Sequence, residues 1–266
     1  MKKIIAMVLA VMLCLGVLAG CASAKSSSAA ADGDLAYIKQ KGTLVIGITE
    51  FEPIDYQDEK GNWIGFDADM ATAFAESLGV KPMFQIINWD NKAMELDGKT
   101  IDVVWNGMTL NDEVKAAMSC SNPYFNNAQV AVVKAADKDK YATVESLKDA
   151  QFAVENGSAG QKQVTALGYK FTPVEDQATA LTEVQSGTSD AAVIDLLMAK
   201  STIGEGTSYA NLTYTAKLNS EEYGVGFRKG SDAVEALNKF FKEKYADGTM
   251  KKLCEQYDIE ADTLIE

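Results

Sequence analysis

The sequence predicts an α/β protein made of two successive α/β units. Short apolar runs of strand length alternate with helical segments, the pattern of α/β folds with largely parallel sheets. The pattern restarts at FAVEN, 152–156. In open α/β sheets ligands bind beyond the carboxyl ends of the strands. Two such units facing each other would therefore form a cleft between NGMT (106–109), VENGSAG (154–160) and VID (193–195).

The first unit opens with a strand, TLVIGI at 43–48. We expect Asp67 to cap the helix that follows, because Asp is a favoured N-cap residue. In that helix Met70, Phe74 and Leu78 recur at i, i+4 and i+8 on one face. The further strands predicted in this unit are KPMFQII (81–87), IDVVW (101–105) and AQVAVVK (128–134).

The stretch NGMTLNDEVKAAM, 106–118, follows the third strand and begins a helix-like pattern with Val114, Ala117 and Met118 at helical spacing. A strand that enters a helix through a glycine-containing turn points free backbone N–H groups outward, as an anion-binding corner does. The turn carries neither Arg nor His. We therefore expect it to offer hydroxyl, amide and backbone donors but no strong cation.

The second unit repeats the alternation of strand and helix. In its helix DQATALTEVQSG, residues Ala178, Leu181, Thr182 and Val184 are predicted to face inward. The other predicted strands are FAVEN, YKFTPV, DAAVID (190–195), LTYTAKL and YGVGFRKG, and the other predicted helices lie in SAGQKQVTAL, SDAVEALNKFFKEKYADG and TMKKLCEQYD. In the longest helix, Val234, Leu237, Phe240 and Phe241 are predicted to form the core face.

The first twenty residues have the features of a secretory signal. Lys2 and Lys3 precede the apolar run IIAMVLAVMLCLGVLAG. The ending Leu18-Ala19-Gly20-Cys21 resembles the bacterial lipobox, which implies cleavage before Cys21 and acylation of its thiol; an ordinary signal with an unrelated Cys is the alternative. Residues 21–34 are polar and of low complexity, which indicates a flexible tether. We expect a lipid-anchored protein on the extracytoplasmic face of the cell membrane.

The charge balance is acidic, with 25 Lys and Arg against 38 Asp and Glu and a net charge of −13. Nucleic-acid binding requires clustered cations to neutralise phosphates, so nucleic acid is not an expected partner. The surface favours cationic or zwitterionic partners through long-range attraction, although acidity also serves solubility alone.

The chain contains no histidine. This excludes Ser–His–Asp and Cys–His nucleophilic pairs and His-based zinc sites. The run NGSAG at 156–160 lacks the glycine spacing of a nucleophile elbow, and the sequence has no phosphate-binding or dinucleotide motif. We expect no cofactor and no metal. Cys120 and Cys254 fit no metal motif; a disulfide between them and two core thiols are the alternatives.

Several motifs occur in an order that is more specific than any one of them. They are GTLVIGI, FEPIDY, GNWIGFDADMATAFAESLGV, IDVVWNGMT, SNPY, LKDAQFAVENGSAG, SGTSDAAVID and YGVGFRKGSD. Together they resemble the polar amino-acid-binding proteins of bacterial ABC importers, solute-binding protein family 3, over about residues 41–257.

The resemblance implies a two-lobed periplasmic-binding-protein-like fold of type II, with two crossover strands as a hinge. Lobe 1 would comprise 35–129 plus 219–266, and lobe 2 would comprise 130–218. It implies a monomeric solute-binding lipoprotein that captures a small polar amino acid and delivers it to an ABC permease. A carboxylate-using, dehydratase-like enzyme on the same fold is the alternative.

The resemblance also assigns site residues. Phe51 and Trp89 would sandwich an aliphatic stem or a cation, although both rings could instead belong to the core. Asp195 would grip the ligand α-ammonium, and it could also cap the helix that follows it. The positions that would hold the ligand through backbone and hydroxyl groups are Asn106, Gly107, Thr109 and Ser158.

One departure from the family pattern bears on the ligand. The arginine that clamps the ligand α-carboxylate is replaced by Val114, and Lys115 lies about 100° away on a helix. Arg228 is the only arginine, and it lies outside the matched site. The weak carboxylate grip is compatible with a ligand that lacks a free α-carboxylate.

Acidic residues occupy matched lining positions. Glu155 is at a position that often contacts the ligand side chain in the family. Glu50 lies near a second such position, with a one-residue gap in the match to the family pattern. If both line the cleft with Asp195, three carboxylates need a cation among them, because unpaired buried charge is costly. We therefore expect a cationic amino acid or related amine rather than an acidic ligand.

Overall fold

The computed structural model describes residues 33–266. The predicted signal, Cys21 and nearly all of the predicted tether lie outside the described residues. Helix α2 (Asp34–Lys41) begins at the last residue assigned to the tether. None of the helices in this described part has the length and hydropathy that a bilayer crossing requires.

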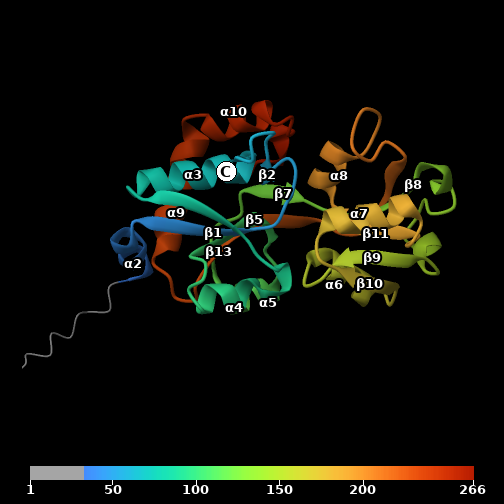
Figure 1. The fold of residues 1–266 in the computed structure, drawn as a ribbon, viewed down its shortest axis with the longest axis horizontal. Helices are drawn as coiled ribbons and strands as arrows, with labels where there is room; N and C mark the ends of the chain where they lie inside the picture. The colour runs from blue at the N-terminus through green and yellow to red at the C-terminus, as the bar shows by residue number, and fades with distance from the viewer. Residues whose placement is uncertain (1–32) are drawn as a thin grey trace, which may run out of the picture. The chain divides into compact units, whose positions relative to one another are not determined.

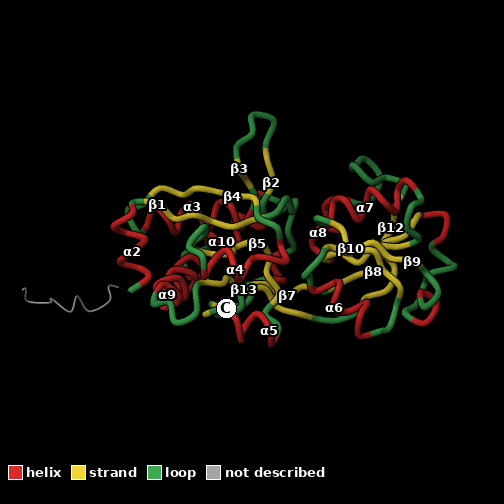
Figure 2. The backbone as a smooth tube through the Cα atoms, turned by 60° about the horizontal axis from the view of Figure 1, so that its bottom comes forward, coloured by secondary structure: helices red, strands yellow, loops and turns green. Residues whose placement is uncertain are grey.

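The first sheet contains six strands. Five follow the order β4-β1-β5-β13-β6, and β7 pairs with β13 (Figure 1). Strands β4, β1 and β5 are mutually parallel, whereas β13 runs antiparallel to β5. The bounds are β1 Thr43–Ile48, β4 Lys81–Ile86, β5 Val103–Thr109, β6 Ser119–Cys120, β7 Phe125–Asn127 and β13 Glu221–Phe227. A hairpin of β2 (Tyr56–Gln57) and β3 (Trp63–Ile64) projects from this part of the chain (Figure 2).

Helices cover both faces of this sheet. Figure 1 shows α3, α9 and α10 on one face and α4 and α5 on the other. Their bounds are α3 Phe66–Ser77, α4 Lys92–Asp97, α5 Asp112–Ala117, α9 Ala233–Ala246 and α10 Thr249–Gln256, and the 3-10 turns are η1 Trp89–Asn91 and η4 Ala261–Thr263.

The second sheet has the strand order β10-β9-β11-β8-β12. Strands β10, β9 and β11 are parallel, and β8 runs antiparallel to β11. The bounds are β8 Gln129–Lys134, β9 Gln151–Glu155, β10 Lys170–Val174, β11 Ala191–Asp195 and β12 Leu212–Lys217; the helices are α6 Ala159–Ala166, α7 Gln177–Ser186 and α8 Leu196–Thr202, with η2 Ala135–Asp137 and η3 Glu145–Leu147. The two helix-covered sheets confirm the predicted α/β fold with two units.

The chain passes between the sheets twice. It leaves the first sheet at Ala128, between β7 and β8, and returns between Lys217 and Glu221, where β12 gives way to β13. The proposed lobes, 35–129 plus 219–266 and 130–218, are consistent with these sheet memberships and stay a prediction.

The core of the first sheet is aromatic on the face under α3 and α9. Trp105 on β5 is fully buried, and its ring centroid lies 5.4 Å from Phe241 and 6.1 Å from Phe74. On the opposite face Val104 packs with Val45 and Val114. Because β5 is buried on both faces, its first three residues form a continuous apolar run rather than an alternating pattern.

Two predicted helix details are wrong. Asp67 is not the cap of α3, whose N-cap is Gly65. The Asp67 carboxylate is fully buried and accepts hydrogen bonds from the backbone N–H of Gly107 at 2.8 Å and from the hydroxyl of Tyr124 at 2.6 Å. Two buried donors therefore claim the side chain that would otherwise cap the helix.

The predicted inward face of α7 is shifted. Asp176 caps the helix, and the buried face contains Ala180, Leu181 and Val184. Thr182 is exposed and donates its hydroxyl hydrogen to the carbonyl of Ala178. In α9, Leu237, Phe240 and Phe241 are buried as predicted, and Val234 is partly buried and packs against the same core.

The predicted glycine-containing turn at NGMT is also wrong. Asn106 and Gly107 lie within strand β5, which continues to Thr109, and the helix α5 is capped by Asn111. Strand pairing with β13 extends to Thr109, which keeps this segment extended. Cys120 and Cys254 are free thiols, so the disulfide alternative is wrong.

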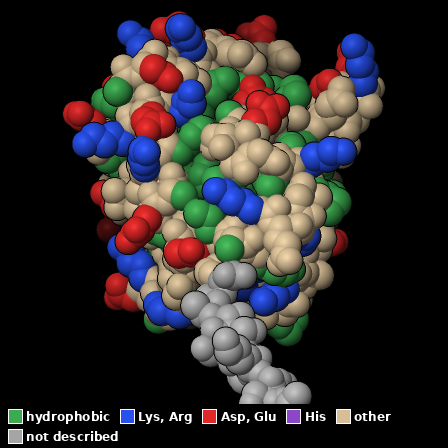
Figure 3. Space-filling model, turned by 90° about the vertical axis from the view of Figure 1, so that its left-hand side faces the viewer, with side chains coloured by type: hydrophobic (Ala, Val, Ile, Leu, Met, Phe, Trp, Pro, Cys, Tyr) green, Lys and Arg blue, Asp and Glu red, His purple; other side chains and the backbone are tan. Residues whose placement is uncertain are grey.

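On the face shown in Figure 3, acidic and basic side chains are interspersed rather than gathered by sign. An interspersed surface gives weaker local fields than clusters of one sign would.

Candidate functional site

A cavity of about 210 Å³ lies at the carboxyl ends of strands from both sheets. Eight of the predicted site residues line it: Phe51, Trp89, Asn106, Gly107, Thr109, Glu155, Ser158 and Asp195. They follow or end β1, β4, β5, β9 and β11, because parallel strands bring their carboxyl ends to one edge of a sheet. That these residues bind a ligand stays a prediction.

Glu50 is the predicted site residue that does not line this cavity. It is exposed, whereas the preceding Thr49 is buried and lines the cavity. Neighbouring side chains of an extended chain point to opposite sides, so the inward position after β1 belongs to Thr49. Sequence reasoning missed Thr49 for this reason.

The side chain of Asn106 is fully used inside the protein. Its Oδ1 accepts hydrogen bonds from the backbone N–H and the hydroxyl of Thr49, each at 2.7 Å. Its Nδ2 donates to the Thr49 carbonyl at 3.0 Å and to Oδ2 of Asp55 at 2.8 Å. Asn106 thus joins β5 to the end of β1 and shapes the cavity floor.

Gly107 allows the floor to approach an aromatic ring. Its φ is +56°, and an added Cβ would lie 2.9 Å from the ring of Phe51 and 2.7 Å from Ile54. Its N–H is already donated to Asp67. The role of Gly107 is therefore spatial, since any side chain there would displace Phe51.

A pair of buried carboxyl groups lies directly beneath this floor. Asp55 and Asp67 are both fully buried, and Oδ1 of each has no hydrogen-bond partner in the described part of the chain. Burial raises the pKa of Asp67 to about 7. Burial, and then the proximity of Asp67, holds the pKa of Asp55 well above its usual value. The pair favours the neutral form of at least one carboxyl group.

The two predicted aromatic residues are buried at the cavity wall. Phe51 packs edge-on against Tyr223 with a centroid distance of 6.4 Å. The ring of Trp89 is covered by Nζ of Lys92, 4.7 Å from its centroid. A cation of the protein itself therefore occupies one face of Trp89, which leaves Phe51 as the ring without such a partner in the described residues.

Asp195 ends strand β11 with its carboxylate held from several sides. Oδ1 accepts from Asn127 at 2.6 Å, Gln129 at 2.9 Å and Tyr223 at 2.5 Å, and Oδ2 accepts from Gln177 at 2.7 Å. Burial, followed by the charge of Glu221, raises its pKa to about 7. Asp195 occupies the N-cap position of α8, but its side chain makes no capping bond. Oδ2 retains room for one further donor.

Glu155 differs from Asp195 in its pairing. It ends strand β9, only 2% of its surface is exposed, and Oε1 has no hydrogen-bond partner among residues 33–266. Burial, and then the charge of Asp195, raises the pKa of Glu155 well above its usual value, while Lys92 opposes that rise. A buried acceptor in a cavity is ready to receive a donor from a ligand.

Ser158 caps α6 by accepting a hydrogen bond from the backbone N–H of Gln161 at 3.1 Å. An acceptor of this kind keeps its own hydroxyl hydrogen available. The hydroxyl can therefore serve the helix and a ligand together.

Two lysines line the cavity that sequence reasoning missed. Nζ of Lys92 donates to the carbonyls of Trp89 at 3.0 Å and Gly157 at 3.1 Å, and burial lowers its pKa to about 8. Nζ of Lys162 donates to Oδ1 of Asn111 at 3.2 Å and forms an ion pair with Glu113. The expectation that no strong cation meets this corner is therefore wrong. The cation comes from α6, far along the chain, so no local pattern could reveal it.

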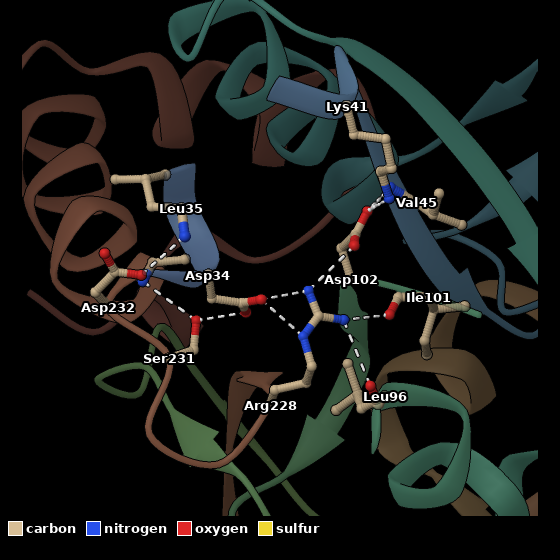
Figure 4. Close-up of polar contacts among 11 residues, drawn as sticks. Asp34, Leu35, Lys41, Val45, Leu96, Ile101, Asp102, Arg228, Ser231 and Asp232 are labelled. Atoms are coloured by element: carbon tan, nitrogen blue, oxygen red, sulfur yellow. Dashed lines mark hydrogen bonds and ion pairs between the residues drawn. The ribbon is translucent and has the colours of Figure 1, made fainter. Parts of the chain in front are cut away.

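The single arginine lies outside the cavity, as predicted. The guanidinium of Arg228 donates from Nε to Asp34, from Nη2 to Asp102 and from Nη1 to the carbonyls of Ile101 and Leu96, and Nη2 also forms an ion pair with Asp34 (Figure 4). Each of its three nitrogens thus has an acceptor. Arg228 joins α2 to the first sheet and does not line the cavity.

Comparisons with known proteins found relatives that cover most of this chain. The L-cystine-binding protein TcyA of Bacillus subtilis (strain 168) is 31% identical over 268 residues, which cover 97% of both chains. The L-cystine-binding protein TcyJ of Escherichia coli (strain K12) is 30% identical over 234 residues, 86% of this chain and 88% of that protein. A crystal structure of a mutant of ArgBP from T. maritima superposes with a TM-score of 0.79 at 32% identity, covering 84% of this chain and 98% of the other.

A family model described as bacterial extracellular solute-binding proteins, family 3, matches residues 44–260. The match confirms the resemblance found in the sequence. It also supports the expectation that the protein binds a solute rather than converting it. The chain belongs to the bacterial extracellular solute-binding proteins of family 3.

Proposed function

We propose that this protein is the extracytoplasmic amino-acid receptor of an ABC importer, anchored by acylation of Cys21. It works as a monomer without a cofactor, captures an amino acid with a cationic side chain between its two lobes, and delivers it to a membrane permease. Family membership supports the receptor role. The names of relatives that bind cystine and arginine support the amino-acid class.

The unpaired Oε1 of Glu155 carries the proposal for a cationic side chain. A buried carboxyl group without a partner is costly, and a cationic donor removes that cost. Lys92 lies nearby, but its ammonium is held by two backbone carbonyls and by the Trp89 ring. An ammonium or guanidinium group of the ligand would complete the pairing.

The same wall offers a separate place for the ligand α-ammonium. Asp195 Oδ2 accepts one hydrogen bond, from Gln177, and can accept another. Glu155 and Asp195 thus provide two acidic positions for the two cationic groups of a basic amino acid. The ring of Phe51 supplies an apolar surface for the carbon chain between them.

Contacts between residues of the two predicted lobes surround the cavity. Nδ2 of Asn156 donates to Asp90 at 3.0 Å, and Lys92 donates to the carbonyl of Gly157 at 3.1 Å. Such contacts favour a closed arrangement in which ligand groups are buried and must be matched. Selectivity would follow from this matching, with no chemical change in the ligand.

A thermal-shift panel tests the proposal. The purified protein is heated with each common amino acid, ornithine, cystine and simple amines, because a ligand that binds only the folded state raises its stability. We expect the largest rise with arginine, lysine or ornithine, and recovery of the ligand unchanged by mass spectrometry. A best response to cystine would keep the amino-acid receptor but overturn the cationic preference. A best response to glutamate or aspartate would overturn the acidic-site argument.

Membrane attachment has its own test. Replacement Cys21→Ala removes the thiol that would carry the acyl chain, so the protein should move from the membrane fraction to the aqueous fraction of expressing cells. Retention of the Cys21→Ala protein on membranes would exclude acylation of this residue as the anchor.

A further inference from the structure

We infer that Lys162 supplies the cation that binds the ligand carboxylate, and that Glu113 occupies this ammonium until the ligand arrives. The inference rests on the proposed amino-acid receptor function and extends it. It adds to that function a requirement for a free carboxylate on the ligand.

The position of Lys162 carries the first part of the inference. Lys162 belongs to α6, next to the second sheet. Its ammonium donates to Asn111, the residue that caps α5 beside the first sheet. Thr109 and Ala159 line the cavity at the same place. The ammonium therefore lies next to the helix whose own residue, Val114, is apolar and lines the cavity.

The remaining bonding capacity of Lys162 fits a ligand. An ammonium group has three N–H donors. Two are used, by Oδ1 of Asn111 and by the carboxylate of Glu113. One donor is free, and the Glu113 position could supply a second, since the side chain of Glu113 is 77% exposed and an exposed ion pair contributes little free energy.

The exchange needs no net change in charge at Lys162. A ligand carboxylate that takes the place of Glu113 replaces one carboxylate by another. Glu113 then returns to water, where its charge is well solvated. Glu113 thus acts as a stand-in for the ligand, and its departure frees the ammonium at low cost.

The other cations near the cavity fit this role less well. Lys92 is held by two carbonyls and lies over the Trp89 ring. Lys115 is exposed and does not line the cavity. Arg228 does not line the cavity either and is held by Asp34 and Asp102. Lys162 is the lining cation whose principal partner is both exposed and exchangeable.

The test compares amino acids with their decarboxylated amines. Calorimetric affinities are measured for arginine against agmatine and for lysine against cadaverine, with the wild type, Lys162→Met, Lys162→Arg and Glu113→Gln. A charge-assisted hydrogen bond contributes about 1.5–3 kcal/mol, so Lys162→Met should weaken arginine binding about 10- to 150-fold and change agmatine binding less than about 3-fold. Lys162→Arg should retain the preference for the amino acid.

Glu113→Gln separates the two halves of the inference. It removes the competing carboxylate but keeps the ammonium, so amino-acid affinity should be unchanged or a few-fold higher. An equal loss for arginine and agmatine in Lys162→Met would overturn the carboxylate role of Lys162. A loss in Glu113→Gln as large as that in Lys162→Met would show that the ion pair itself, rather than exchange, supports binding.

A failure of the proposed function gives a different result from a failure of the role of Lys162. If the panel selects a different amino acid, the same comparison is made with that amino acid and its decarboxylated amine, so the role of Lys162 is tested apart from the cationic preference. If the wild-type protein binds no amino acid and no amine, both the proposed function and this inference are overturned.

Discussion

Two buried groups of charged residues in this protein differ in how completely their polar atoms are paired. In the cluster around Arg228, every guanidinium nitrogen has an acceptor, and both oxygens of the fully buried Asp102 have donors, among them Lys41 and the N–H of Val45 (Figure 4). At the cavity, Oε1 of Glu155 has none.

The degree of hydrogen-bond pairing distinguishes the structural cluster around Arg228 from the candidate site better than charge does. Both groups combine carboxylates with cations, so composition does not distinguish them. Complete pairing leaves nothing for a ligand to satisfy, whereas an unpaired buried acceptor beside a cavity gains free energy when a donor enters. Arg228 accordingly holds α2 against the first sheet, whereas Glu155 is the group that we propose for ligand binding.

The largest effect is expected from a substitution in the fully paired cluster around Arg228. Arg228→Met leaves the buried carboxylate of Asp102 without one of its cations, and removal of one partner from a buried pair costs about 3–5 kcal/mol. Urea unfolding should show this loss, while the affinity of the folded protein for its ligand should be unchanged. The more exposed partner Asp34, replaced by Asn, serves as a milder control. Lost affinity with intact stability would place Arg228 in the site after all.

The second prediction concerns the pH dependence of stability that arises from Asp67. Like Glu155, Asp67 has an unpaired oxygen, but it lies beneath the cavity floor rather than in the cavity wall. Its folded pKa is about 7, above the ordinary value of 3.8. The neutral carboxyl group of Asp67 therefore stabilises the folded state fully below pH 3.8, and this stabilisation is lost as the pH rises through about 7. The expected slope is about 1.4 kcal/mol per pH unit for each proton.

The substitution Asp67→Asn tests the direction of this pH dependence of stability. An amide oxygen can still accept from Gly107 and Tyr124, so the fold should persist. The free energy of unfolding of Asp67→Asn, relative to the wild type, should rise between pH 4 and pH 8 in urea titrations. Parallel pH profiles for the two proteins would mean that Asp67 does not change its protonation on unfolding in this range.

A smaller effect is expected where the cavity walls touch. Gly157 has φ +72°, and an added Cβ would lie 2.7 Å from Cα of Asp90 across the cavity. Gly157→Ala should weaken ligand binding by about 1–3 kcal/mol, a 5- to 150-fold change in the calorimetric dissociation constant, through overpacking. Gly168→Ala is the matched control, since φ is +70° there with open space around the added carbon. Equal effects of the two substitutions on affinity would show that strain, not contact, is responsible.

The α/β fold and the location of the cavity could be predicted from the sequence. The buried strands are continuous apolar runs, and the ends of parallel strands meet at one edge. What each lining residue does could not be predicted. The side-chain amide of Asn106 makes all of its hydrogen bonds to Thr49 and Asp55, which only the folded geometry reveals, and ligand binding through its backbone stays a prediction.

The missed residues share a physical cause. Lys162 reaches Asn111 across 51 positions of sequence, and Lys92 reaches the carbonyl of Gly157 across 65. Family patterns pointed to a cation at position 114, where this chain has Val114. A cation supplied by another helix leaves no local signal, and only the contact in three dimensions shows it.

The most direct test of the central claim, that Glu155 receives a cationic group, compares arginine with citrulline, which has the same shape without the charge. Calorimetric affinities of both ligands are measured for the wild type and for Glu155→Gln. A lost charge-assisted bond of about 1.5–3 kcal/mol predicts arginine binding about 10- to 150-fold weaker in Glu155→Gln, with citrulline affected less than about 3-fold. Unchanged arginine affinity, or equal losses for the two ligands, would contradict the account.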